Sequence, residues 1–181
     1  MDQVFSFREV AIDDNPVPEF RTVIDYWTAQ ARGKFAPSWL DIDMLRLPAP
    51  LLPLCIVVDL APDGGPISYR YFGSGVADLH GFELTRRTTD AIEPPELRNH
   101  IVSQYRIVER ERRPVFFATE ISVKDGHRLR HLMLRLPLSD DGDRVTGIMT
   151  FEDYASNREE LRAYYTEITK DSDGYLSQSF D

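Results

Sequence analysis

Cysteine is almost absent from this chain, and its scarcity excludes several kinds of site. Cys55 is the single cysteine among 181 residues. One thiol cannot form an internal disulfide, and it cannot supply a cysteine-based zinc site, which needs several ligands. Because Cys55 stands among Leu54, Ile56 and Val57, we expect a buried, inert strand residue.

Positive charge is also scarce. The chain carries 21 basic and 30 acidic side chains, which gives a formal net charge of −9. An acidic protein is poorly suited to the phosphate backbone of nucleic acid or to an anionic lipid surface. We therefore expect no nucleic-acid partner and no membrane partner. Residues 152–181 hold eight acidic and three basic side chains, and a solvated helix and tail is the ordinary explanation of such a run.

Long apolar runs are missing as well. The longest apolar-rich stretch, residues 45–60, is interrupted by Arg46, by prolines and by an acidic residue, so it is too broken to span a bilayer. Residues 1–8 lack the basic and apolar regions of a secretory signal. These features together predict a cytoplasmic protein.

The order of the apolar segments predicts the fold class. Two β-rich runs come first, a mostly helical stretch follows, and three more β-rich runs come after it: Leu54–Leu60, Ile67–Phe72, Val115–Val123, His127–Leu138 and Val145–Phe151. Short turn-forming segments join neighbouring runs and force antiparallel pairing. We predict an α+β fold in which a five-stranded antiparallel sheet carries helices on one face and encloses a small cavity.

Helical spacing and capping residues divide the rest of the chain. A helix is predicted to begin near Pro18, a short one after Asp43, the longest over about 96–112, and a final one at the capping sequence 156–159. The length fits one domain with terminal extensions. We expect residues 1–17 to form a flexible leader or an edge strand, 18–153 the domain, and 154–181 a C-terminal helix and acidic tail.

The first predicted helix has an aromatic-rich face. Phe20, Val23, Ile24 and Trp27 follow the spacing of one helical face. Such a stripe has to be buried against the protein's own sheet or against a second copy. We predict a homodimer interface at these four residues.

Short motifs along residues 18–153 are similar to those of a bacterial family of short, often stand-alone PAS-like proteins. The matching pieces are Tyr26-Trp27 with Arg32-Gly33, Pro37, Asp41-Ile42-Asp43, Leu51-Leu52-Pro53, Tyr69-Arg70-Tyr71-Phe72-Gly73-Ser74, Gly81-Phe82-Glu83-Leu84-Thr85 and Leu136-Pro137-Leu138-Ser139. The resemblance implies the PAS fold and a role in sensing or protein interaction, commonly linked to bacterial kinases or second-messenger enzymes. In one departure, Arg86 stands where the family often has glycine, whose backbone shape arginine disfavours.

The resemblance does not name a cofactor, because PAS-like modules bind haem, flavin, small acids or nothing. A PAS-type flavin photosensor needs a reactive cysteine in an Asn-Cys-Arg context on a helix, and Cys55 has neither. Haem needs an axial ligand, usually histidine. His100 on the longest helix is the candidate, but it lies at the margin of the apolar face, where a half-exposed side chain is the ordinary interpretation. The cofactor stays unknown.

Two polar residues interrupt apolar faces and define the candidate ligand site. Gln104 lies on the apolar face of the longest helix, and Thr119 is the polar member of the Val115–Val123 stripe. Buried polar groups need partners, which would be ligand atoms in a cavity, or else backbone or water. We predict that Gln104 and Thr119 face the cavity from opposite walls, with four apolar neighbours: Ile101, Val108, Phe117 and Leu134.

Polar residues also gather at the start of the fourth β-rich run. His127 and His131 could form a metal pair, but no carboxylate has convincing spacing beside them. We expect a solvated strand face shared with Arg128 and Arg130. Carboxylate binding by these two arginines at the cavity mouth is the alternative.

Motifs of catalysis are missing: the sequence has no nucleophile elbow, no phosphate loop with lysine and no kinase set. We predict a non-catalytic regulatory module that binds a signalling protein such as a histidine kinase, with a small ligand in its cavity. Its C-terminal helix, with Leu161, Tyr164, Tyr165 and Ile168 on one side, is a candidate docking or relay element. The alternatives are a module with a filled core and a small cyclase- or isomerase-type enzyme, which needs an inward carboxylate–histidine pair that no stripe combines.

Overall fold

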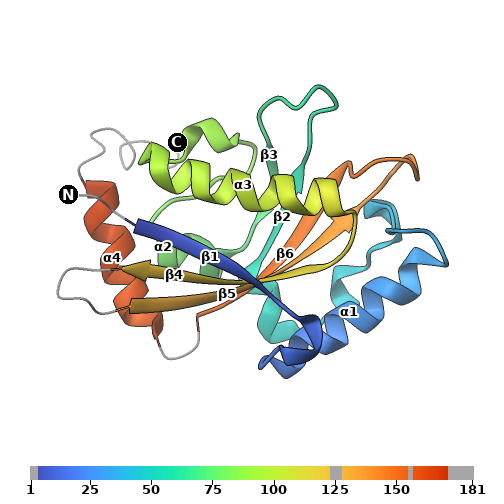
Figure 1. The fold of residues 1–181 in the computed structure, drawn as a ribbon, viewed down its shortest axis with the longest axis horizontal. Coiled ribbons are helices and arrows are strands. Elements are labelled where there is room, and N and C mark those ends of the chain that lie inside the picture. The colour runs from blue at the N-terminus through green and yellow to red at the C-terminus, as the bar shows by residue number, and fades with distance from the viewer. Residues whose placement is uncertain (1–3, 123–127, 155–156, 171–181) are drawn as a thin grey trace.

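One antiparallel sheet organises the computed structural model, which describes residues 4–122, 128–154 and 157–170 (Figure 1). Its six strands are ordered β1-β4-β5-β6-β2-β3. The strands are β1 (Val4–Val10), β2 (Cys55–Asp59), β3 (Ser68–Phe72), β4 (Val115–Ser122), β5 (Arg128–Leu138) and β6 (Gly147–Asp153). The α-helices are α1 (Pro18–Ala31), α2 (Ser74–His80), α3 (Pro95–Glu111) and α4 (Arg158–Lys170). The predicted α+β class is confirmed.

Short 3-10 helices make up most of the connections. They span Ile12–Asp14, Trp39–Asp41, Met44–Arg46, Ala49–Leu54 and Thr89–Ala91. Asp43 caps the third of them by accepting the backbone N–H of Leu45, as predicted. Part of the predicted capping sequence of α4 lies outside the described residues. None of the described helices combines the length and the apolar character needed to cross a bilayer.

The sheet has one strand more than predicted. β1 pairs with β4 from Val4 opposite Ser122 to Val10 opposite Phe116. The side chains of Phe5 and Phe7 pack onto the apolar cluster beneath α3, and this packing explains why the segment is a strand. Residues 4–10 are therefore an edge strand rather than part of a flexible leader.

Helices cover both faces of the sheet, whereas one covered face was expected. Alternate residues of a strand point to opposite faces. On β5, Leu129 and Met133 belong to the apolar cluster that also contains residues of α2, α3 and α4. Leu132, Leu134 and Leu136 belong to the second cluster, which contains the buried side chains of α1. The two faces are called here the α3 face and the α1 face (Figure 1).

The aromatic-rich stripe of α1 is buried inside the chain's own core. Phe20 and Val23 are fully buried, and Ile24 is half-buried. Trp27 is buried as well and donates its indole N–H to the carbonyl oxygen of Pro137, at 2.8 Å. The predicted homodimer interface at these residues is wrong, because they stabilise the contact between α1 and the sheet.

Arg86 adopts a backbone conformation that usually favours glycine. Its φ of 67° lies in the left-handed region, which costs a side-chain-bearing residue about 1–2 kcal/mol. The backbone N–H of Arg86 donates to the carbonyl oxygen of Tyr69 at 2.8 Å, and this bond holds the turn against the third strand.

Candidate ligand-binding site

A small cavity lies between α3 and the sheet, on the α3 face. The volume open to the centres of water molecules is about 30 Å³, which is room for roughly two waters. Side chains of α2, α3, α4 and five strands contribute to its walls. Most wall residues are aliphatic, phenylalanine, tyrosine or methionine. The other residues in the wall are His80, His100, Thr119, His131, Arg135 and Glu152.

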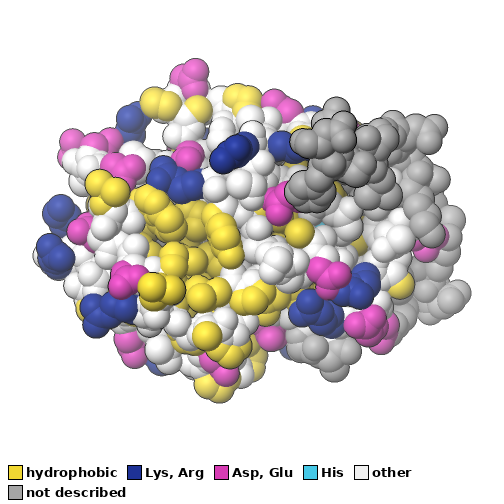
Figure 2. Space-filling model, turned by 180° about the vertical axis from the view of Figure 1, so that it is seen from behind, with side chains coloured by type: hydrophobic (Ala, Val, Ile, Leu, Met, Phe, Trp, Pro, Cys, Tyr) yellow, Lys and Arg dark blue, Asp and Glu magenta, His cyan; other side chains and the backbone are white. Residues whose placement is uncertain are grey.

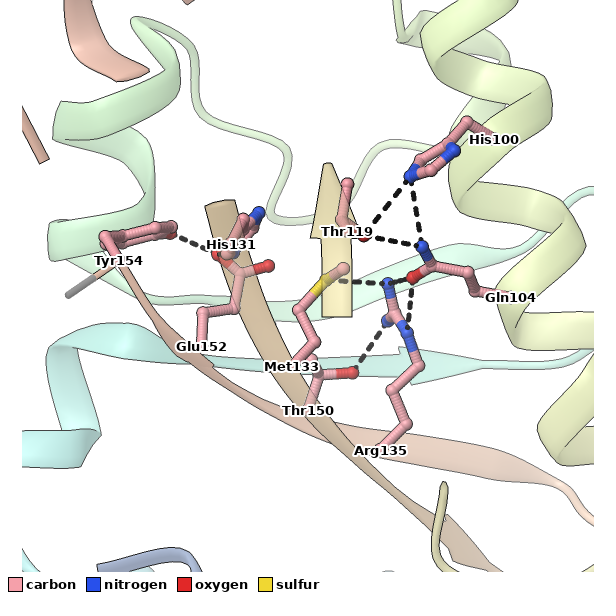
Figure 3. Close-up of polar contacts among 9 residues, drawn as sticks. All are labelled: His100, Gln104, Thr119, His131, Met133, Arg135, Thr150, Glu152 and Tyr154. Atoms are coloured by element: carbon pink, nitrogen blue, oxygen red, sulfur yellow. Dashed lines mark hydrogen bonds and ion pairs between the residues drawn. The ribbon is translucent and has the colours of Figure 1, made fainter. Parts of the chain in front are cut away.

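Gln104 is the centre of the polar network beside this cavity (Figure 3). Its side chain is fully buried. The amide oxygen accepts two hydrogen bonds from the guanidinium of Arg135, at 3.2 and 2.8 Å. The amide nitrogen lies 3.2 Å from Thr119 Oγ1 and 3.0 Å from His100 Nε2. Gln104 and Thr119 thus meet directly from helix and sheet, rather than facing each other across open space.

Arg135 is a buried cation that sequence reasoning missed. Only 1% of it is exposed. Besides Gln104, it donates to Thr150 Oγ1 at 2.9 Å and lies 3.4 Å from the sulfur of Met133. Its guanidinium carbon lies 4.1 Å from the centre of the Tyr105 ring. All these partners are uncharged, although burying a charge is costly without a counter-charge.

A second buried cluster joins Glu152, His131 and Tyr154. The Tyr154 hydroxyl donates to Glu152 Oε2, and His131 Nε2 lies 3.4 Å from the same oxygen. Burial would raise the pKa of Glu152, but the contacts with His131, His80 and Tyr154 together outweigh it and lower that pKa to about 2. Burial and the neighbouring Glu152 raise the pKa of Tyr154 well above its usual value. Glu152 is therefore an ionised carboxylate with its own partners.

His80 Nδ1 in the cavity wall lacks a partner among the described residues, and His131 Nε2 has only its ion-pair contact with Glu152. His80 Nδ1 and His131 Nε2 are buried and make no hydrogen bond within the described residues; the approach of His131 to Glu152 has the distance of an ion pair only. Burial lowers the pKa of His80 to about 4. Burial and the charge of Arg135 do the same for His100. His80 and His100 are thus uncharged near neutral pH.

The structure places the predicted site residues in three different ways. Ile101 and Thr119 line the cavity. Val108 and Phe117 are buried in the same apolar cluster but stand outside the cavity wall. Leu134 is a wrong prediction, because its strand position points it to the α1 face.

The histidine predictions also need correction. His131 is 3% exposed, so it does not share the solvated strand face of Arg128 and Arg130, which are exposed. His127 lies outside the described residues. His100 is half-buried, which agrees with the sequence-based expectation, and the rings of Phe5 and Phe7 are centred 5.4 and 5.3 Å from its own. Within the described ranges, no three potential ligands among His, Cys, Asp and Glu are arranged to hold a metal.

Neither a flavin nor a haem fits this site. The cavity is far smaller than the roughly 300–1,000 Å³ of pockets for larger ligands. Cys55 belongs to the α1 face, so its thiol cannot reach the cavity, and burial raises its pKa. His100 is the candidate haem ligand on α3, but its Nε2 lies 3.0 Å from the amide nitrogen of Gln104.

Solved structures similar to this chain include a PAS domain and two light-oxygen-voltage proteins. The PAS domain of a protein from Colwellia psychrerythraea is 16% identical, with a TM-score of 0.41 over 64% of this chain and all of that one. The dark state of the Aureochrome1 LOV blue-light photoreceptor is 16% identical, with a TM-score of 0.41 over 67% and 86% of the two chains. An RNA-binding light-oxygen-voltage receptor is 17% identical, with a TM-score of 0.40 over 94% and 44%.

These structures carry no argument about ligand or activity at such identities and scores. No curated protein matches the sequence significantly. The family comparison is more informative, because a model described as the PAS domain matches residues 16–150. That range contains α1, α2, α3 and all of the strands β2 to β5. Since the match extends over most of the chain, the protein belongs to the PAS domain family.

Proposed function

We propose that this PAS domain is a non-catalytic sensory module of the cytoplasm, which binds a small polar ligand in its cavity and reports it to a protein partner. The observation that carries the proposal is the unpartnered Nδ1 of His80 in the cavity wall. A buried polar atom without a partner costs about 1–3 kcal/mol. A ligand that bonds this nitrogen would remove that cost.

Binding is better supported than catalysis, although one expectation against an enzyme was wrong. The enzyme alternative requires an inward carboxylate–histidine pair, and Glu152 with His131 is such a pair. However, a carboxylate with a pKa of about 2 is a weak base near neutral pH. The hydroxyl of Tyr154 also engages one of its oxygens. These features favour a structural role for the pair.

Helix α4 connects the cavity with the surface. Tyr165 lines the cavity, and its ring centre lies 4.0 Å from that of His80 on α2. Leu161 and Ile168 are buried in the same cluster, so α4 packs against the core, and its role as a relay element stays a proposal. A ligand that contacts His80 would alter the packing of α2 on α4, and this contact is the route we propose for the signal.

The ligand proposal predicts a retained or stabilising small molecule. We expect native mass spectrometry of the purified protein, or a thermal-shift screen of small polar compounds, to detect it. His80→Phe should lose the response while keeping the fold, because an apolar ring replaces an unpartnered nitrogen. Ala163→Ser, on the exposed side of α4, is the control. A protein that retains nothing and responds to no compound has a filled core instead.

The partner surface that we propose is an apolar area on the side of the molecule hidden in Figure 1. Figure 2 shows apolar side chains gathered on that side. The side chains of Leu40 and Leu45 are 93% and 88% exposed, and half-buried apolar neighbours include Trp39, Ile42 and Met44. Exposed apolar patches mark interaction sites. A signalling protein such as a histidine kinase is the partner that we propose.

The partner surface can be tested with a double variant. Leu40→Ser with Leu45→Ser should change the free energy of unfolding by only about 0.5 kcal/mol, because both side chains are exposed. The double variant should fail to capture the proteins that the wild type captures and that mass spectrometry identifies. The Ala163→Ser control should still capture them. Light scattering of both proteins tests the case in which the partner is a second copy. Equal capture and equal mass would reject this surface.

A further inference from the structure

The outer edge of β1 is an open end of the sheet. β1 is the first strand in the spatial order, and Figure 1 shows it in front of β4 and β5. We propose that two copies of the chain pair through this edge, strand β1 antiparallel to strand β1, so that one sheet continues into the other. The pairing requires no ligand in the cavity, so it goes beyond the sensory function proposed above.

The two edges of the sheet differ in how the chain treats them. At the opposite edge, the backbone N–H of Tyr69 on β3 donates to the carbonyl oxygen of Arg87 at 2.8 Å. The segment that contains Arg87 thus closes that edge. The backbone of β1, by contrast, makes no hydrogen bond outside its ladder with β4 among residues 4–122, 128–154 and 157–170. Unpaired groups of this kind are a template for another strand.

Pro137 shows which way the backbone groups of the neighbouring strands point. Proline has no backbone N–H, so Pro137 on β5 and Ile148, which lies opposite it on β6, form a non-hydrogen-bonded pair. The backbone groups of Pro137 and of every second residue before it therefore point to β4. One of these residues is Arg135, which bonds to Val115, the residue opposite it on β4.

The same alternation fixes the outward groups of β1. Since Val115 and every second residue after it bond to β5, the residues between them bond to β1. Their partners on β1 are the even-numbered residues, from Val4 opposite Ser122 to Val10 opposite Phe116. The N–H and C=O groups that point away from the sheet are those of the odd-numbered residues: Phe5, Phe7 and Glu9.

β1 lacks most features that protect an edge strand from pairing. It is seven residues long, contains neither proline nor lysine, and pairs with β4 without a bulge. Its two charged residues, Arg8 and Glu9, are adjacent near one end, so residues 4–7 carry no charge. Prolines, lysines and bulges are the usual means of keeping an edge single.

One register of the pair uses every outward group. A two-fold axis perpendicular to the sheet keeps each side chain on its own face, so residues of the same face lie opposite each other. With Phe7 opposite Phe7 of the partner subunit, Phe5 lies opposite Glu9 of the partner subunit. Each of these is a hydrogen-bonded pair. An axis at Ser6 leaves Glu9 without a partner in β1, and an axis at Arg8 leaves Phe5 without one.

The side chains fit the register centred on Phe7. Ser6 lies opposite Arg8 of the partner subunit, and no like charges face each other directly. An axis at Arg8 would instead oppose two arginines, which is destabilising. Phe5 and Phe7 are half-buried in the free chain, and pairing would cover more of both rings. Aromatic pairs across antiparallel strands stabilise a sheet. These features favour a second copy of this chain as the occupant of the edge.

The proposed interface shares contacts with the cavity wall. The rings of Phe5 and Phe7 are centred 5.4 and 5.3 Å from the ring of His100, and His100 lines the cavity. A ligand that moves His100 would therefore shift the two phenylalanines at the centre of the interface.

A pair of variants at Glu9 tests the hydrogen bonds of the edge. Glu9→Pro removes an outward N–H and leaves the ladder with β4 intact, because proline is tolerated where an edge N–H faces solvent. Glu9→Ala is the matched control: both variants lose the ion pair with Arg113, and only the proline loses the N–H. Light scattering and analytical ultracentrifugation of the full chain should show a dimer for the wild type and for Glu9→Ala. Glu9→Pro should dimerise about tenfold or more weakly.

Crosslinking tests the register. Ser6→Cys and Arg8→Cys proteins are mixed, dissociated, reassociated and oxidised, and mass spectrometry identifies the linked peptides. Non-hydrogen-bonded partners have Cα atoms about 4.5 Å apart, a separation that a disulfide spans. The native Cys55 is fully buried and should not take part. We expect crosslinks that join position 6 of one chain to position 8 of the other.

Every result supports or overturns the proposal. Links between two copies of position 6 or two copies of position 8 would overturn the register, and absence of any link would overturn the pairing. A monomeric wild type at all concentrations, or a dimer that Glu9→Pro leaves unchanged, would also overturn it. If Glu9→Pro does not fold, the crosslinks still decide. A dimer lost in Leu40→Ser with Leu45→Ser but kept in Glu9→Pro would place the contact at the apolar area instead.

Discussion

Gln104→Leu is expected to lower the free energy of unfolding by about 3 kcal/mol or more, because it leaves a buried cation without its main acceptor. The Gln104 amide oxygen accepts from both Nε and Nη2 of Arg135, and leucine has no acceptor. Urea denaturation of the variant and of the wild type measures the difference.

A control variant and a double variant test this prediction further. Ser103→Ala, at an exposed neighbouring position on α3, should cost far less. The double variant Gln104→Leu with Arg135→Met should recover much of the lost stability, because replacing a whole buried polar pair by apolar groups is often nearly neutral. Additive losses in the double variant, or equal losses in Ser103→Ala and Gln104→Leu, would contradict the role assigned to this contact.

Glu152→Gln is expected to lower the stability by roughly 3 kcal/mol at neutral pH, and by less in acid. The pKa of Glu152 falls from 4.5 to about 2 in the folded protein, so its ionised form stabilises the fold. That contribution is complete above about pH 4.5 and is lost as the pH falls through about 2. The titratable groups that interact with this carboxylate include His131, His80, Tyr154, Tyr165, Tyr69 and Cys55.

The measurement is the free energy of unfolding of both proteins from pH 7 down to the lowest pH at which they fold. Glu120→Gln provides a matched control, because Glu120 pairs with Arg128 at the surface and such pairs contribute about 0–1 kcal/mol. A difference between wild type and Glu152→Gln that stays constant over this range would show that Glu152 is not held ionised by its neighbours.

Residue patterns predicted five of the six strands and two members of the polar network, Gln104 and Thr119. The five β-rich runs all became strands, because alternation and turn residues are local signals. Gln104 and Thr119 were identified since each interrupts an apolar face, and they do meet. Pairing of β1 with β4 joins segments more than a hundred residues apart, and nothing local specifies it.

Arg135, His131 and Glu152 were missed because the sheet was taken to have one covered face. The prediction placed Leu134 beside the cavity and His131 on a solvated strand face. Residues 132–138 are nearly all apolar except Arg135, and a continuous apolar run indicates a strand buried on both faces. That signal could have placed Arg135 inside, against the general rule that arginine is exposed.

Because helices cover both faces of the sheet, the stability of the fold and the shape of the cavity depend on different sets of side chains. The α1 face is packed with apolar side chains such as Phe20, Trp27 and Leu134, while the cavity and its polar network lie on the other side of the same strands. Substitutions that reshape the cavity would leave the α1 packing in place as a reserve of stability. Relatives that keep this arrangement could therefore diverge in ligand while retaining one backbone.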